Sequence, residues 1–125
     1  CSSDLHAYYM YPMILDTTLL GVSRDRIHAA LVAEGVPGLA QGYQNVHLLP
    51  MYQKKTAYGS RGFPWTSDIC RRPVDYSKGI CPVAENLHDQ TYMGLEMCAH
   101  ELKDEDIDLI VAAFFKVWKA MESLR

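Results

Sequence analysis

The last quarter of the chain holds the feature that most constrains the fold, an apolar stripe with helical spacing. The stripe consists of Ile107, Ile110, Val111, Phe114, Trp118 and Met121. Asp104 is a residue type that caps helices, acidic residues follow it, and Lys116 and Lys119 stand near the other end, as the helix dipole favours. We therefore predict an amphipathic helix that starts at Asp104 and packs this stripe against a core.

Earlier segments predict further strands and helices. Residues 6–15 are apolar at both alternating positions, which is typical of a strand covered on both faces, and Pro12 in this run indicates a sheet edge or a bulge. Ser23 can cap a helix that Gly35 would end, with His28 on its solvent side.

The second half of the chain begins with a long irregular stretch. Residues 53–80 are rich in glycine and proline without periodicity, so they predict one long loop that forms a site or an interface. Pro82 then predicts a short helix, and the alternation in residues 93–97 a half-buried strand. The whole order predicts a single small α+β domain over residues 1–125, with helices on one face of a mainly antiparallel sheet.

Composition excludes several classes of partner. The formal net charge is -3 and the basic residues form no stripe, which argues against nucleic acid. No apolar run is long enough for a membrane span, so we expect a soluble, cytoplasmic protein. Four cysteines without C-x-x-C spacing favour reduced, buried thiols over disulfides or a zinc site, so no metal is expected.

The chain starts with CSSD rather than with an initiator methionine. We expect a fragment or a domain cut from a longer protein. A lipidated terminal cysteine and an amino-terminal nucleophile remain alternatives.

One short stretch combines a histidine with aromatic residues. Residues 42–53 read GYQNVHLLPMYQ, and Pro50 predicts a shaped loop rather than a regular element. His47 in this loop would either face a substrate or hold the loop by bonding to a nearby carbonyl. Glu85 and His88 are three residues apart on the predicted short helix and form a second candidate, an acid/base pair.

Five segments in this order resemble the carboxy-terminal small domain of the DegT-type aminotransferases. They are the H-x-Y-Y-x-Y-P run at 6–12, SRDRIHAALVAEGVP at 23–37, the loop at 42–53, CPVAE at 81–85 and KDEDIDLI at 103–110. These fold-type I enzymes use pyridoxal phosphate (PLP) to aminate keto-sugars and aminocyclitol precursors. The resemblance covers nearly the whole chain, and the GSRGFPW run at 59–65 resembles the cyclitol branch most.

The resemblance implies a cofactor domain upstream, absent from this chain, and a homodimer with active sites at the subunit interface. It places Tyr43, His47, Pro50 and Tyr52 on the substrate-facing loop. Arg61 either reaches an anionic group of the substrate or is a solvated charge of the long loop. No lysine here matches the family's Schiff-base motif, so the chain is expected to bind no PLP by itself and to contain no catalytic residue. The alternative is a stand-alone, non-catalytic module that binds a polyol or assists assembly.

Overall fold

The computed structural model describes residues 9–125, so Cys1 and the start of the predicted first strand lie outside the described residues. The chain divides into two compact units. We call Cys1–Tyr43 together with Asp89–Arg125 the sheet unit, and Gln44–His88 the loop unit. Each is described by itself below.

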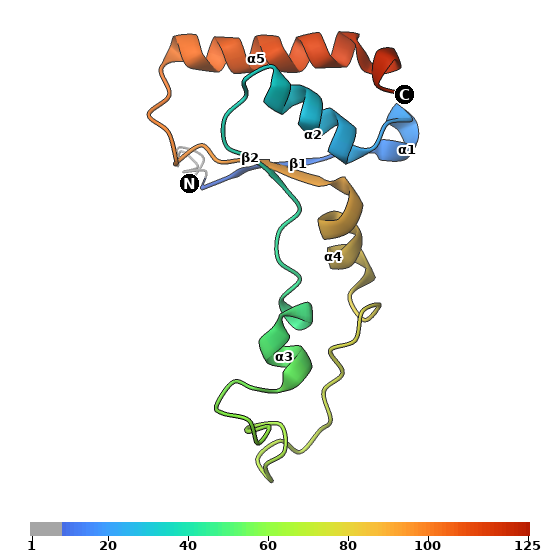
Figure 1. Ribbon diagram of the computed structural model, residues 1–125, viewed down its shortest axis with the longest axis vertical. Helices are drawn as coiled ribbons and strands as arrows, with labels where there is room; N and C mark the ends of the chain where they lie inside the picture. Colours follow the sequence, from blue (N-terminus) through green and yellow to red (C-terminus); the bar gives the residue numbers. More distant parts are fainter. Residues whose placement is uncertain (1–8) are drawn as a thin grey trace, which may run out of the picture. The chain divides into compact units, whose positions relative to one another are not determined.

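The sheet unit contains a three-stranded antiparallel sheet (Figure 1). Its strands are β1 (Tyr11–Ile14), β2 (Leu39–Gln41) and β3 (Tyr92–Leu95), in the order β1-β3-β2. Pro12 lies in β1, an edge strand, as the sequence indicated. The predicted cover on both faces is wrong, because most of β1 is exposed.

The helices of the sheet unit are α1 (Thr17–Leu20), α2 (Arg24–Ala33) and α5 (Asp104–Lys119), and a 3-10 turn, Met121–Leu124, follows α5. Figure 1 shows α2 and α5 on the same side of the sheet. The predicted α+β class and the antiparallel pairing are therefore confirmed. No helix within residues 9–125 combines the length and the apolar character that a bilayer crossing requires.

Local signals placed α2 correctly. The Ser23 hydroxyl accepts the Arg26 N–H, as a helix cap does, and Gly35 follows the helix with a φ of 88° that favours glycine. His28 is half-buried and its Nε2 lies 3.2 Å from the Leu39 carbonyl oxygen, so the prediction of a solvated ring is wrong.

One hydrophobic core lies between the sheet and these helices. Its buried members are Leu15, Val22, Ile27, Leu31, Val36, Met93, Leu95, Ile110, Ala113, Val117 and Met121. All of them belong to the sheet unit. Within β3, Met93, Gly94 and Leu95 are buried in succession, so the strand is covered more fully than the predicted half-burial.

The predicted stripe of α5 is only partly used by this core. Ile110 and Met121 are buried, but Ile107, Val111 and Trp118 are 38%, 46% and 40% exposed. The N-cap also differs from the predicted one. The helix starts at Asp104, and Lys103 rather than Asp104 is its N-cap residue. The apolar surface of α5 is therefore wider than the core that it covers.

The loop unit has little regular structure. It contains a 3-10 turn (Val46–Leu48), α3 (Pro50–Lys54) and α4 (Pro82–Asn86), and a π-helical segment, Leu87–Thr91, leads out of it. Pro50 begins α3 at its first turn, where a missing N–H is tolerated, so the prediction of a loop without a helix is wrong there. The long irregular stretch between α3 and α4 is confirmed.

Candidate functional site

A largely buried histidine–carboxylate pair connects the 3-10 turn to α4 within the loop unit. His47 Nε2 is 2.9 Å from Glu85 Oε1, and the two side chains are 12% and 8% exposed. His47 lies in the 3-10 turn and Glu85 in α4, which Pro82 starts at its first turn. Spacing had suggested His88 as the partner of Glu85, but the imidazole bonded to the carboxylate comes from 38 residues away.

The Glu85 carboxylate also binds the backbone that precedes α4. Both of its oxygens accept the Gly79 N–H at 2.8 Å, and Oε1 accepts the Cys81 N–H at 3.3 Å. Gly79 has a φ of 106°, a conformation that side chains other than hydrogen rarely permit. The Gly79 N–H lowers the pKa of Glu85 most, and the bond to His47 lowers it further although burial opposes both.

This arrangement determines what His47 can offer to a ligand. In the neutral imidazole, a carboxylate that accepts from Nε2 selects the tautomer in which Nε2 carries the proton, and Nδ1 is then a hydrogen-bond acceptor. An acceptor held in this way suits a hydroxyl group. His47 therefore holds the loop as one of the two predictions had it, although its partner is a carboxylate and not a carbonyl. Its contact with a substrate stays a prediction.

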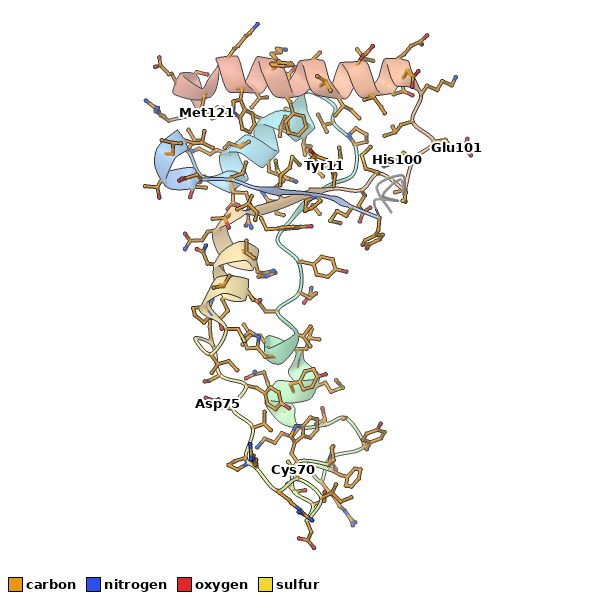
Figure 2. All side chains as sticks on the ribbon, turned by 180° about the vertical axis from the view of Figure 1, so that it is seen from behind. Tyr11, Cys70, Asp75, His100, Glu101 and Met121 are labelled. Atoms are coloured by element: carbon orange, nitrogen blue, oxygen red, sulfur yellow. The ribbon has the colours of Figure 1, made fainter. Side chains whose placement is uncertain are left out.

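Gln53 links the same turn to the returning end of the long loop. Its side-chain amide donates to the His47 carbonyl at 2.7 Å and to the Tyr76 carbonyl at 2.5 Å. Asp75, labelled in Figure 2, accepts the N–H and the hydroxyl of Ser77 at 2.8 and 3.0 Å, which lowers the pKa of Asp75. Polar bonds of this kind close the loop unit on itself.

Three aromatic rings pack against one another in the loop unit, in addition to the polar bonds. Tyr52 packs against Tyr76 at a centroid distance of 5.1 Å and edge-on against Trp65 at 6.1 Å. The Trp65 indole N–H donates to the Tyr76 hydroxyl at 2.9 Å. Phe63, in contrast, is 43% exposed and pairs with Tyr58, which is 74% exposed. The long loop therefore has a small aromatic core and also displays aromatic surface.

The four residues predicted to face a substrate lie in both units. His47 and Tyr52 occupy consecutive elements of the loop unit, and Gln53 connects these elements. Arg61 is exposed on the long loop. Tyr43 belongs to the sheet unit, is 60% exposed, and bonds to Tyr9, a contact that raises the pKa of Tyr9.

Sequence reasoning missed Asn45. This side chain is 8% exposed, and its Nδ2 has no hydrogen-bond partner among the described residues. A buried amide donor without an acceptor is uncommon, so it implies a water or a bound group that supplies one. The only signal in the sequence was its place two residues before His47.

The thiols offer no metal site in the described part of the chain. Cys70 and Cys81 are free thiols, and no three potential metal-binding side chains gather within residues 9–125. Cys81 and Cys98 are exposed, so the predicted burial of the thiols is wrong there. Comparisons with family models, curated proteins and solved structures found no match for this chain.

Replacing Glu85 with glutamine is expected to open the loop unit locally. Glutamine keeps the size of the side chain, but it removes the negative charge. It also replaces one of the two oxygens that accept the Gly79 N–H with an amide group that can only donate. Backbone amide exchange at Gly79 should accelerate about tenfold, as measured by NMR. Glu101→Gln, at an exposed position, is the control and should leave these rates unchanged.

The same contacts predict an acid response. Because folding lowers the pKa of Glu85, its contribution is complete above the ordinary value of 4.5 and is lost as the pH falls through the lower folded value. Protection of the Gly79 amide should therefore decrease below about pH 4.5 in the wild type. If the Gly79 amide of Glu85→Gln lost the same protection over the same pH range, protonation of Glu85 would not be the cause.

Proposed function

We propose that this chain is the small, substrate-wall domain of a PLP-dependent aminotransferase that acts on a keto-sugar or keto-cyclitol in the cytoplasm. The resemblance of five segments in order motivates this function. The observation that carries it in the structure is His47, held by buried Glu85 within an aromatic-rich loop unit. A fixed imidazole acceptor in a unit that also carries aromatic rings is chemistry that suits a polyol.

In this proposal each group has a defined role. The His47 Nδ1 accepts a sugar or cyclitol hydroxyl. Tyr52 stabilises the loop through Trp65 and Tyr76, and the buried Asn45 amide supplies a donor. Arg61 meets an anionic substituent.

The residues of this chain do not fit PLP by themselves. Aldimine formation requires a desolvated lysine, and Lys54, Lys55, Lys78, Lys103, Lys116 and Lys119 are all exposed. The proposal therefore assigns the cofactor and its lysine to an upstream domain, and no chemical step is derived within this chain.

Ligand titration by NMR tests the proposal on the chain itself. A uniformly labelled sample is titrated with an aminocyclitol and, separately, with a nucleotide-linked sugar. We expect saturable shifts around residues 44–53 with a Kd on the order of 1 mM, since a single wall makes few contacts. His47→Phe, which keeps a ring but removes the acceptor, should weaken binding about tenfold. Absence of shifts with both probes would overturn the assignment.

A self-closed loop unit also fits the second candidate, a non-catalytic polyol-binding or assembly module. Sequencing the gene upstream of Cys1 in the same reading frame separates the two. A lysine-bearing domain in that frame would support the aminotransferase. Sugar binding without such a domain would support the module.

A further inference from the structure

The loop unit is basic although the chain as a whole is acidic. It contains six basic and three acidic residues, a net charge of +3, and the whole chain carries -3, so the remaining residues carry -6. One of the three acidic side chains, Glu85, is buried against His47 and backbone N–H groups. A charge asymmetry of this kind favours an anionic partner for the loop unit.

Two pairs of neighbouring cations supply most of this positive charge. One basic pair is Lys54 and Lys55 at the end of α3, and the other is Arg71 and Arg72 on the long loop. All four side chains are exposed. None of them forms an ion pair with another residue in the range 9–125. These cations can therefore meet an external anion without breaking an internal bond.

Apolar side chains are exposed on the chain between the two basic pairs. Tyr58, Phe63 and Ile69 are 74%, 43% and 78% exposed. The rings of Tyr58 and Phe63 pack edge-on at a centroid distance of 5.9 Å. The same stretch of the loop unit therefore displays positive charge and hydrocarbon together.

Tight turns hold part of this stretch in a folded form. The N–H groups of Thr66, Ser67 and Cys70 donate at 3.1, 3.1 and 2.9 Å to the carbonyls of Gly62, Pro64 and Ser67. Cys70, labelled in Figure 2, lies directly before the arginine pair. The turns thus present Ile69 and the arginine pair on a short folded segment rather than along a helix or a strand.

This combination selects among anionic partners. Successive bases of a single strand stack on open aromatic faces, but the Tyr58 and Phe63 rings stand at 67° to each other and Ile69 has no ring. An acidic protein would need an apolar pocket that fits these three side chains. A lipid interface accepts aromatic and aliphatic groups in any arrangement, while its anionic headgroups attract lysine and arginine. An anionic membrane surface therefore fits both the charge and the apolar groups.

We propose that the loop unit binds to the surface of an anionic membrane. The two basic pairs contact the lipid headgroups, and the exposed side chains of Tyr58, Phe63 and Ile69 enter the interface. Binding of this kind lies at the surface and needs no membrane-spanning segment. It uses neither His47 nor Arg61, so it does not depend on the proposed aminotransferase function.

Vesicle binding by the full chain tests the role of the charges. The vesicles contain phosphatidylcholine alone or with about one third phosphatidylserine, and bound protein is measured by co-sedimentation. We expect binding to the anionic vesicles only, and its loss at about 0.5 M salt, where charges are screened within about 4 Å.

Paired substitutions locate the charges that matter. Arg71→Gln with Arg72→Gln, and separately Lys54→Gln with Lys55→Gln, should each weaken binding at least about tenfold, since one cation near an anionic surface contributes about fivefold. The control, Lys103→Gln with Lys119→Gln, removes the same charge from exposed positions of the sheet unit and should change binding less than about twofold.

Two isoleucines test the apolar contact. Ile69→Ser should weaken binding about tenfold, because a largely exposed aliphatic side chain no longer enters the interface. Ile14→Ser changes the same side chain at a position of the sheet unit that is 70% exposed, and it should leave binding unchanged. Circular dichroism spectra of both variants should match the wild type.

Several results would overturn the proposal. They are absence of binding to anionic vesicles, equal binding to both kinds of vesicle, and equal effects of the loop-unit variants and their sheet-unit controls. A single-stranded oligonucleotide or a polyglutamate peptide that binds while anionic vesicles do not would also overturn it, and would give the basic pairs a different partner.

Discussion

Replacing Leu31 with alanine is expected to lower the free energy of unfolding of the sheet unit by about 2–5 kcal/mol. Leu31 lies in α2 and is 0% exposed, so the change removes buried methyl groups and leaves a cavity in a close-packed core. Alanine favours helix at least as well as leucine, so the loss comes from packing rather than from helix propensity. Urea unfolding followed by circular dichroism measures it.

Leu109→Ala is the matched control. Leu109 has the same side chain on another helix, α5, but is 70% exposed. Its replacement should change the free energy of unfolding by less than about 0.5 kcal/mol. Equal effects at the two positions would mean that α2 does not contribute the centre of the core.

The second large effect is expected at Arg24. This residue starts α2 and is 7% exposed, and its guanidinium donates to the Tyr92 and Asp89 carbonyls at 3.3 and 3.2 Å. Arg24→Ala removes both bonds between the helix start and the segment that leads into β3. We expect a loss of about 2–3 kcal/mol in the free energy of unfolding, because the carbonyls lose a charged donor.

Two further variants define the cause of this loss. Arg24→Lys keeps the charge but replaces the planar fork with one ammonium, so it should recover only part of the loss. Arg26→Ala, two residues along α2, removes exposed bonds to the carbonyls of Leu124 and Arg125 and should cost less than about 1 kcal/mol. Full recovery by lysine would show that charge alone is needed at this position.

Short-range patterns predicted most elements of the sheet unit. Ser23 and Gly35 delimited α2 because a hydroxyl cap and a left-handed residue act on their own neighbours. Pro12 indicated an edge strand for the same reason, since its missing N–H is a property of the residue itself. The α+β class followed from the order of these elements.

The candidate site could be predicted less well. The sequence drew attention to His47 and Tyr52, but it paired Glu85 with His88 through helical spacing. Glu85 lies instead against His47, 38 residues away, because the long loop returns beside the turn that holds the histidine. No periodicity encodes that return, and Asn45 carried no signal of its burial.

The sequence by itself determined where α2, α4 and α5 form, since capping, proline geometry and apolar spacing act within a few residues, although it missed α3. Tertiary structure decided which half of the α5 stripe is buried, because burial depends on where α2 and the sheet lie: Ile110 enters the core while Val111 stays 46% exposed. It also decided the partner of Glu85, since a carboxylate binds whatever donors the folded chain brings within reach.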